Sequence, residues 1–381
     1  MSNIRFFKAS SGYTAHINSF YAQHPEFREL NYESGLDAFF DDCFSWADFW
    51  KKNLEKTGKF HVCEVVFNNE VLQKKWALEN NFKFSHDNWQ HEILIEQLCN
   101  FKPDVLFITD IYNYAGWYKD IKKIIPSLKL VLAWDGILWH KPGTFSECDI
   151  VLSCVEDSVE FYRLNGKRSF FFPFGFEKSI LNKLTKNPVP YEVSFVGSIV
   201  LIPGYHYGRL RSISHLSAKV PMNIWASNFV QPGMPLIKGQ VKRLLNLKFR
   251  EFADVMRIAL KNRGELFGKA MYNTLYNSKF TFNTHGDNSL TKAANFRLTE
   301  ATGVGSCLVT DWKENISNYF DPENEIVTYR TIDEAAEKIN YLLENENKRK
   351  AIAEAGQLRT LNEYSFEKRI NDFVTYLNTQ L

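Results

Sequence analysis

The residues from 279 to 311, KFTFNTHGDNSLTKAANFRLTEATGVGSCLVTD, restrict the possible folds of this chain more than any other stretch. Residues 279–283 are β-prone and predict a strand, and the short apolar run at 307–310 predicts a second, buried strand. A polar turn lies between them, followed by a helix expected from about Thr291 that ends at the glycines beginning with Gly303. A strand, a helix and another strand in this order indicate part of a parallel α/β sheet.

The same stretch carries side chains that suit a nucleotide. Arg297 and Glu300 are three residues apart, so they project from one face of the expected helix. The turn and the start of the helix gather backbone N–H groups, which suit phosphate oxygens. A cation and a carboxylate beside such a turn can grip the phosphate and the ribose diol of a nucleotide. The alternative interpretation is an exposed i,i+3 ion pair worth a few tenths of a kcal/mol.

The chain has 381 residues, which is more than one hydrophobic core usually spans, so two domains are expected. Strands and helices alternate regularly in the first half, which predicts a doubly wound parallel sheet. Its strands are expected at 4–9, 61–67, 104–109, 128–134, 149–154 and 169–173. Residues 176–190 are polar and lack any helical or strand period, so we interpret them as the interdomain linker.

Ligands of doubly wound sheets bind beyond the C-terminal ends of the strands, so the polar residues there are the candidates in the first half. These residues include Gly12, Asp110, Tyr112, Asp135, Trp139 and His140. His16 is a further candidate, because it lies on the first turn of the helix expected at 13–23. Aromatic rings beside the two aspartates suit a sugar acceptor, because they are flat and have hydrogen-bonding edges; core packing is the alternative. For His16 the alternative is a surface or packed residue. An amphipathic helix expected at 36–57 is interpreted as core packing.

The second half opens with a strand expected at 192–196, which ends in Gly197 and Ser198. Glycine permits close approach of a ligand to the backbone, and exposed N–H groups at such a turn can meet an anion. Arg209 lies on the helix that is expected to follow. Further on, Thr331 and Glu334 form a capping box, which predicts a helix start.

Composition bounds the class of protein. A net charge of +2 is too balanced to indicate a nucleic-acid binder by itself. The six cysteines include no C-x-x-C pair, so we expect buried free thiols in a reducing compartment rather than disulfides or a zinc site. The N-terminus has no signal-peptide pattern, and no apolar run approaches the roughly 20 residues that cross a bilayer. We therefore expect a cytoplasmic protein.

A basic segment with an apolar side spans residues 238–269. One interpretation is peripheral contact with an anionic membrane or a lipid-phosphate acceptor. The alternative is a solvated helix packed on the second domain, because runs of charge usually face water.

The motifs from residue 297 onward resemble the C-terminal half of spore-maturation-type (CgeB-like) glycosyltransferases, which have the GT-B fold. That family has an R-x-x-E helix, a strand ending in Thr/Ser-Asp, a turn with Phe and Glu before the next strand, and a characteristic start of the last helix. The matching positions are Arg297, Glu300, Asp311, Phe320, Glu325, the helix at 333–343, and the segments 349–356 and 365–369. The first half resembles the family only in layout.

The resemblance implies two Rossmann-like doubly wound parallel-sheet domains that face each other across a cleft. The acceptor-side domain is expected at 1–180 and the nucleotide-sugar domain at 191–365, with a helix at 366–381 crossing back to the first domain. The implied activity is transfer of a hexosyl or deoxyhexosyl group from a nucleotide-sugar donor to a glycan or lipid-linked glycan, in surface polysaccharide biosynthesis.

The resemblance also implies roles in donor binding. Glu300 is expected to hold the ribose hydroxyls, and Arg297 with the Gly197–Ser198 turn and Arg209 is expected to neutralise the diphosphate. Asn283 and His285 are expected to line the phosphate or sugar side.

Many GT-B enzymes carry a second Glu ahead of the ribose one, at the position of Lys292 here, so Lys292 is expected to serve the phosphates instead. No D-x-D motif with supporting context occurs, and we expect neither a metal nor a cofactor. An inverting enzyme needs a base in the first domain. Asp135 is the first candidate, followed by Asp110 and His16.

Two other functions stay open. A non-catalytic relative would bind a nucleotide-sugar without turnover and would tolerate loss of Asp135, Asp110 and His16. A dinucleotide oxidoreductase is disfavoured, because no G-x-G-x-x-G follows a strand.

Overall fold

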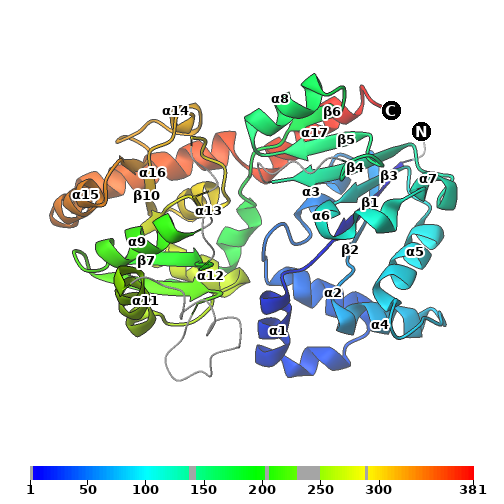
Figure 1. Cartoon of the computed structure of the whole chain (residues 1–381), viewed down its shortest axis with the longest axis horizontal. Coiled ribbons are helices and arrows are strands. Elements are labelled where there is room, and N and C mark those ends of the chain that lie inside the picture. The colour runs from blue at the N-terminus through cyan, green and yellow to red at the C-terminus, as the bar shows by residue number, and fades with distance from the viewer. Residues whose placement is uncertain (1–2, 137–142, 202–205, 230–248, 288–290) are drawn as a thin grey trace. The chain divides into compact units, whose positions relative to one another are not determined.

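A computed structural model describes residues 3–136, 143–201, 206–229, 249–287 and 291–381, which form two α/β units (Figure 1). The first unit comprises Met1–Pro173 and Phe366–Leu381, and the second comprises Phe174–Ser365. Residues 174–180, assigned to the first domain from sequence, therefore lie in the second unit. The reason is local packing, because Phe176 is buried and its backbone N–H donates to the carbonyl oxygen of Tyr364.

The first unit is built on a six-stranded sheet in the order β2-β1-β3-β4-β5-β6, in which all paired strands are parallel. Its strands are β1 (Ile4–Ser10), β2 (Phe60–Val66), β3 (Val105–Ile108), β4 (Leu130–Asp135), β5 (Ile150–Ser153) and β6 (Arg168–Phe171). Its α-helices are α1 (Thr14–Gln23), α2 (Tyr32–Asp41), α3 (Phe49–Lys56), α4 (Glu70–Glu79), α5 (Trp89–Phe101), α6 (Ile111–Tyr114), α7 (Ile121–Ile124), α8 (Glu156–Leu164) and α17 (Phe366–Leu377).

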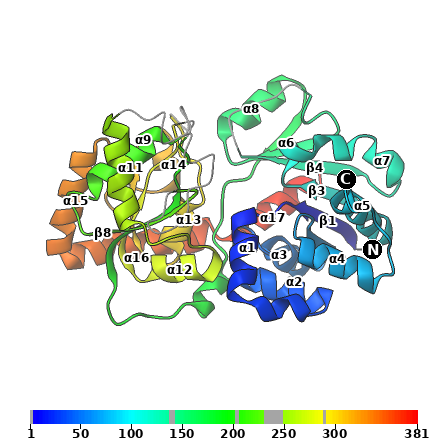
Figure 2. The same cartoon turned by 60° about the horizontal axis from the view of Figure 1, so that its bottom comes forward.

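Aromatic packing attaches the C-terminal helix to the first unit. Helix α17 lies beside α3 in that unit (Figure 2). The fully buried Trp50 on α3 has its ring centroid 5.1 Å from that of Phe373 on α17 and 4.7 Å from that of Phe107 on β3. Side chains of this size each bury a large apolar area. These aromatic side chains are therefore core material of the first unit.

The single helix expected at 36–57 is two helices. α2 ends at Asp41 and α3 begins at Phe49, and between them Cys43, Ser45 and Ala47 have positive φ angles. Left-handed backbone interrupts a helix, and the apolar spacing of the sequence does not report it. The interruption turns Trp46 toward the end of β4, where its ring lies 4.8 Å from that of Trp134.

The second unit is built on a five-stranded sheet in the order β11-β10-β9-β7-β8, again with parallel pairs. Its strands are β7 (Tyr191–Ser198), β8 (Met222–Ser227), β9 (Ser278–Asn283), β10 (Cys307–Asp311) and β11 (Val327–Tyr329). Its helices are α9 (Tyr207–Leu216), α11 (Phe249–Lys261), α12 (Gly268–Tyr276), α13 (Arg297–Gly303), α14 (Ile316–Tyr319), α15 (Ile332–Glu344) and α16 (Glu346–Glu363). At the predicted capping box, the Thr331 side chain accepts from the backbone N–H of Glu334 at the start of α15.

Each sheet has one point at which the strand order reverses. From β1 the chain goes to β2 on one side and then to β3 on the other side; from β7 it goes likewise to β8 and then to β9. In each sheet, the loops that follow the two strands at this point, β1 and β3 or β7 and β9, therefore lead away in opposite directions. This arrangement leaves a crevice at the C-terminal edge of the sheet. The predicted doubly wound fold class is confirmed, and these two edges are where binding residues are to be sought.

A buried ion pair crosses the first sheet. Lys8 on β1 stands opposite Glu64 on β2, their Nζ and Oε2 atoms are 2.8 Å apart, and both residues are at most 3 % exposed. Lys8 also donates to the carbonyl oxygen of Ala47, and Glu64 accepts from the backbone N–H of Lys51. The pair therefore ties the interrupted segment between α2 and α3 to the sheet.

We predict that Lys8→Met destabilises the first unit by about 3–5 kcal/mol, because it leaves the Glu64 carboxylate buried without its counter-charge. The double variant Lys8→Met/Glu64→Leu should recover most of that loss. Urea unfolding measures both values. Lys74→Met, which breaks the exposed pair with Glu70, is the matched control and should cost less than about 1 kcal/mol. Equal losses for the Lys8 and Lys74 variants would contradict this account.

Candidate functional site

The candidate site of the second unit is the C-terminal edge of its sheet, around β7, β9 and β10. Asn283, the last residue of β9, stands opposite Thr310 on β10, and Asp311 ends β10. Strands β7 and β9 are neighbours at the reversal of strand order. The predicted residues Gly197, Ser198 and Asn283 thus lie at the ends of strands that flank the crevice.

Two arginine side chains lie against the end of β7. Arg209 on α9 donates through Nη1 to the carbonyl oxygen of Ser198 at 3.0 Å. Arg297 on α13 donates through Nη2 to the carbonyl oxygen of Val196 at 2.9 Å. Gly197 and Ser198, expected to form a turn, are the last two residues of β7. The structure therefore brings both predicted arginines to the end of this strand, where their positive charge suits an anionic ligand.

Arg297 and Glu300 form an ion pair that is buried rather than exposed. The Nη1 and Oε2 atoms are 2.8 Å apart, and the side chains are 13 % and 8 % exposed. Burial raises the pKa of Glu300, while Arg297 and the Tyr272 hydroxyl partly offset that rise. The Tyr272 hydroxyl lies 3.4 Å from Oε1, a long hydrogen bond. Sequence reasoning missed Tyr272, because nothing local in the sequence links it to Glu300.

Helix α13 begins at Arg297, not at about Thr291 as predicted. The preceding segment is held by tertiary partners instead: Asn315 accepts from the backbone N–H of Ala293 and donates to its carbonyl oxygen. Lys292 lies on this segment, and its Nζ atom is 3.4 Å from Oε2 of Glu314. The expected helix N-terminus at Thr291, with its free N–H groups, is therefore not formed there.

Asp311 gathers the side chains at the ends of β9 and β10. Its Oδ1 atom accepts from the backbone N–H (3.1 Å) and from Nδ1 (2.7 Å) of His285, and Lys313 lies 3.2 Å from Oδ2. Burial alone would raise the pKa of Asp311, but the charge and hydrogen bonds of His285, together with Lys313, lower it to about 2. Sequence reasoning named Asp311 only as part of a family motif and missed Lys313.

The start of α9 is capped by a side chain from the loop after β9. The carboxylate of Asp287 accepts from the backbone N–H of Gly208 at 3.0 and 3.1 Å. A Cβ atom at Gly208 would lie 2.5 Å from that carboxylate, so a larger residue there would require the Asp287 side chain to shift. The contact connects the loop that carries His285 to the helix that carries Arg209.

In the first unit, Asp135 is fully buried at the end of β4. Its two carboxylate oxygens accept from the hydroxyls of Tyr112 (2.9 Å) and Tyr162 (2.8 Å). Burial and the charge of Asp135 raise the pKa of both tyrosines. Asp135, the first candidate for the base, thus accepts hydrogen bonds from two tyrosine hydroxyls. One of these donors is Tyr112, which was expected from the sequence to contact the sugar acceptor.

His16 is also buried, with its Nε2 atom 2.8 Å from Oδ2 of Asp42. Its ring lies 4.2 Å from the ring of Phe44 and 5.0 Å from that of Phe39, measured between centroids. His16 is therefore a packed residue, which was the alternative interpretation, and its side chain is not open to a substrate.

Asp110 differs from the other two, because it is half-buried at the reversal point of the first sheet. It caps α6 and accepts from the Ser11 hydroxyl at 2.7 Å. Gly12, in the loop after β1, exchanges two hydrogen bonds with the side chain of Asn68. Trp139 and His140 lie outside the described residues.

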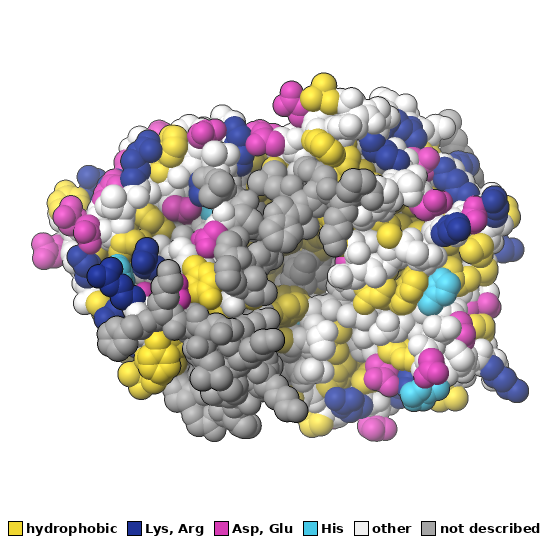
Figure 3. All heavy atoms as spheres, in the orientation of Figure 1, with side chains coloured by type: hydrophobic (Ala, Val, Ile, Leu, Met, Phe, Trp, Pro, Cys, Tyr) yellow, Lys and Arg dark blue, Asp and Glu magenta, His cyan; other side chains and the backbone are white. Residues whose placement is uncertain are grey.

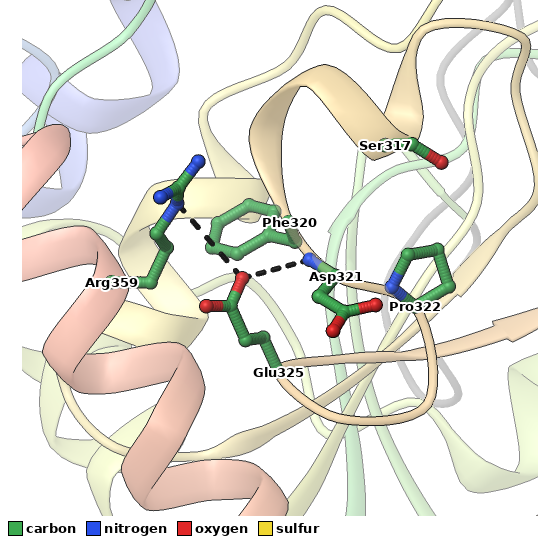
Figure 4. A pocket seen from close by; sticks show the side chains of 6 residues that line it. All are labelled: Ser317, Phe320, Asp321, Pro322, Glu325 and Arg359. Carbon is green, nitrogen blue, oxygen red and sulfur yellow. Dashed lines mark hydrogen bonds and ion pairs between the residues drawn. The ribbon is translucent and has the colours of Figure 1, made fainter.

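A separate pocket of about 290 Å³ lies between α14, α16 and the loop before β11 (Figure 4). Within it, Glu325 accepts from the backbone N–H of Asp321 at 2.8 Å and lies 3.9 Å from Nε of Arg359. Glu325 precedes β11, so the pocket is at the N-terminal edge of the sheet, away from the edge that binds ligands in such folds. Phe320 and Glu325, the Phe and Glu of the family motif that precedes the strand, therefore shape a turn.

The described residues contain no group of three or more His, Cys, Asp or Glu side chains that could hold a metal ion. Among the described helices, none is both long and apolar enough to cross a membrane. On the face drawn in Figure 3, positive and negative side chains are interspersed. All six cysteines are free thiols, but only four are buried as expected, because Cys63 and Cys99 are half-buried.

The comparisons with known proteins agree with this geometry. Residues 212–375 match a family described as glycosyl transferase-like. HepE of Anabaena, solved in complex with UDP-glucose, is 11 % identical, with a TM-score of 0.59 and coverage of 99 % of this chain and 100 % of that one. A sucrose-phosphate synthase from Thermosynechococcus elongatus (9 % identity, 99 % of each chain) and a glycosyltransferase from Rickettsia africae (10 %, 100 % and 99 %) have the same TM-score.

The fold is therefore GT-B, the two-domain glycosyltransferase fold, and a glycosyl transferase-like domain covers most of the second unit. No protein among the curated sequences matches the chain.

We predict that the Asp311 carboxylate stabilises the second unit in a pH-dependent manner. Because folding lowers its pKa from 3.8 to about 2, the stabilisation is present above pH 4 and is lost as the pH falls toward 2. The shift corresponds to about 2 kcal/mol. Asp311→Asn should therefore reduce the free energy of unfolding in urea at pH 7 and weaken its decline below pH 4. Asp321→Asn, on the exposed turn beside the pocket, is the control and should leave the decline in the free energy of unfolding below pH 4 unchanged. If Asp311→Asn showed the same decline as the unaltered chain, Asp311 would not be its source.

Proposed function

We propose that this protein is a glycosyltransferase that moves a sugar from a nucleoside-diphosphate sugar to a glycan or lipid-linked glycan. The observation that carries the proposal is the buried Arg297–Glu300 pair beside the end of β7, in a chain of GT-B fold. HepE, which has the same fold, was solved with UDP-glucose and with UDP, which supports a nucleotide-sugar as the donor. CgeB-like membership, hexosyl or deoxyhexosyl transfer and a role in surface polysaccharide biosynthesis are part of this proposal.

The donor's diphosphate binds at the end of β7 in this proposal. Arg209 and Arg297 supply positive charge there, beside Gly197 and Ser198 at the end of the strand. Negative charge grows on the diphosphate as the sugar leaves, so fixed cations lower the barrier. Glu300 accepts a ribose hydroxyl through Oε1, displacing the long bond from Tyr272. We propose that no metal or cofactor takes part.

We propose Asp110 as the base for the acceptor hydroxyl, in place of Asp135. A base must reach the proton that it removes. Asp110 is half-buried at the crevice of its own sheet, whereas Asp135 is fully buried beneath two tyrosine hydroxyls and His16 is packed among aromatic rings. Gly12, Tyr112, Trp139 and His140 remain proposed acceptor contacts.

We also propose a cytoplasmic location with peripheral contact to the inner face of a membrane. Phe252, Met256 and Leu260 recur every four residues along α11 and are 45 %, 42 % and 76 % exposed. A row of this kind with nearby Arg257 and Lys261 suits a membrane interface. The rest of the predicted basic segment, residues 238–248, lies outside the described residues.

A non-catalytic nucleotide-sugar binding protein is the second candidate. The specific observation in its favour is that two of the three predicted bases, Asp135 and His16, are buried and already have hydrogen-bonding partners. Such a protein would bind the donor and release no sugar.

Glu300→Gln should weaken binding of the nucleotide-sugar at least tenfold and abolish transfer, because the amide cannot accept from the ribose diol with the strength of a carboxylate. Calorimetry with UDP, GDP, ADP and dTDP sugars measures binding, and donor hydrolysis measures turnover without an identified acceptor. Glu346→Gln removes another Glu–Arg pair at the same spacing, with Arg349, and should change neither quantity. Unchanged binding in Glu300→Gln would argue against the proposal.

Asp110→Asn should lower the rate of transfer about 10²-fold or more while leaving donor affinity within twofold, because removal of a general base acts on the chemical step. Asp157→Asn, at an exposed position at the start of α8, is the control with the same chemical change. Full activity of Asp110→Asn would exclude Asp110 as the base, and donor binding without turnover in the unaltered chain would favour the second candidate.

A further inference from the structure

The helix that carries Arg297 and Glu300 is short, and its neighbours decide where it lies. Helix α13 has only seven residues, from Arg297 to Gly303. A helix of this length is not stable on its own, so its position depends on packing and hydrogen bonds from elsewhere in the second unit. Two aromatic residues of one short segment, Phe174 and Phe176, contact its two ends.

The ring of Phe174 stacks on the residue that precedes α13. The centroids of the Phe174 and Phe296 rings are 3.8 Å apart, and the ring planes are inclined by 29°. Phe296 is the N-cap of α13, and its carbonyl oxygen accepts from the backbone N–H of Glu300 at 2.9 Å. The position of the Glu300 backbone therefore depends on Phe296 and, through the stacked rings, on Phe174.

The ring of Phe176 lies against the other end of the same helix. A Cβ atom at Gly303, the last residue of α13, would overlap this ring, so a side chain there would force the buried Phe176 to shift. The ring centroid of Phe176 also lies 6.3 Å from that of Tyr272, in an edge-to-face arrangement. Because the Tyr272 hydroxyl reaches Glu300, Phe176 packs against both the helix and the hydrogen-bond donor to its carboxylate.

These two aromatic residues belong to the segment through which the chain enters the second unit. Pro173 is the last residue before the chain leaves the first unit, and Phe174 is the first residue of the second. The backbone N–H of Phe176 donates to the carbonyl oxygen of Tyr364 at 2.8 Å, and Ser365 is the last residue before the chain returns to the first unit. The two places where the chain passes between the units are therefore connected at Phe176.

We propose that Phe174 and Phe176 are positioning residues of the donor site, and that they couple nucleotide binding to the segment that joins the units. The inference rests on the proposed function, which assigns Arg297 to the diphosphate and Glu300 to the ribose. By holding both ends of α13, the two rings keep these side chains where the ligand needs them. Coupling of this kind is reciprocal, so a bound nucleotide stabilises the joining segment to the same extent.

Helix α16 is the alternative source of the position of α13. The hydroxyl oxygens of Thr302 and Thr360 are 2.6 Å apart, and Nε2 of Gln357 donates to the carbonyl oxygen of Gly303 at 3.0 Å. Both hydrogen bonds are at the last two residues of α13, whereas the stack on Phe174 acts at its start, next to Arg297. If α16 alone placed the helix, loss of the Phe174 ring would not change nucleotide affinity.

The test is a double-mutant cycle on nucleotide affinity in the full chain. Phe174→Leu and Phe296→Leu each remove one ring of the stack. Calorimetry measures the affinity for whichever of UDP, GDP, ADP and dTDP the unaltered chain binds most tightly. We expect each variant to bind that nucleotide about fivefold more weakly or worse. The double variant should bind no more weakly than the weaker single variant, because either change removes the same contact.

Two further variants are matched controls. Phe174→Tyr keeps the ring and should bind the nucleotide within about twofold of the unaltered chain. Tyr191→Leu removes a half-buried ring that lies 5.1 Å from that of Trp225 at the start of β7, the end of the strand away from the arginines. It should leave the affinity unchanged. Thermal unfolding shows whether each variant is folded; if Phe296→Leu is not, Phe174→Leu compared with Phe174→Tyr decides.

Hydrogen exchange measures the coupling from the side of the joining segment. Saturating nucleotide should slow exchange of the Phe176 N–H several times more than that of the Tyr191 N–H, which donates to the carbonyl oxygen of Asn277 at 2.7 Å. The difference should shrink in Phe174→Leu. General stabilisation of the folded unit by a ligand would slow both N–H groups alike.

The outcomes separate the inference from the proposed function. Unchanged affinity in Phe174→Leu would overturn the inference while nucleotide binding by the unaltered chain still supports the proposed function. Additive losses in the double variant would overturn it as well, because the two rings would then act independently. Equal slowing at Phe176 and Tyr191 would overturn the coupling to the joining segment. If the unaltered chain binds none of the nucleotides or their sugars, the proposed function fails, and the inference fails with it.

Discussion

The parallel pairing of β7 with β9 is the constraint on which the candidate site depends. Parallel neighbours require a crossover, and here the crossover through β8 places consecutive loops on opposite sides of β7. Ser198 and Asn283, which lie 85 positions apart in the sequence (283 − 198), therefore end adjacent strands. Arg209, Arg297 and the carboxylates of Glu300 and Asp311 all lie around that edge, so their chemistry follows from the strand order rather than from any one motif.

Buried charge is handled in the same way in both units. Lys8 with Glu64, and Arg297 with Glu300, are each paired across a hydrogen-bond distance and removed from water. Such pairs add little net stability but make the loss of one partner expensive, so they fix geometry. In the first unit the pair fixes an interrupted segment, whereas in the second it holds the carboxylate proposed for the donor.

Local patterns predicted well where a segment makes its own contacts. Thr331 caps its helix as predicted, although Glu334 accepts from the backbone N–H of Arg330 and not from that of Thr331. The strands around 279–283 and 307–310 lie where alternation and apolar runs placed them. Predictions were wrong where distant side chains replace local hydrogen bonds. Asn315 holds the segment before Arg297 out of a helix, and left-handed residues such as Cys43 divide the helix expected at 36–57. Neither the hydrogen bonds from Asn315 nor the left-handed backbone at Cys43 can be recognised from neighbouring residues in the sequence.

The sequence by itself determined the α/β class, the two units and the approximate strand ends that carry polar residues, because these depend on periodicity and on neighbours along the chain. Only the tertiary structure decided the state of each side chain at those ends. It turned Asp135 toward two tyrosines and left Asp110 half-buried, and it joined His285 to Asp311 by two hydrogen bonds. The physical reason is that burial and hydrogen-bond direction depend on groups far apart in sequence, which only the assembled sheet brings together.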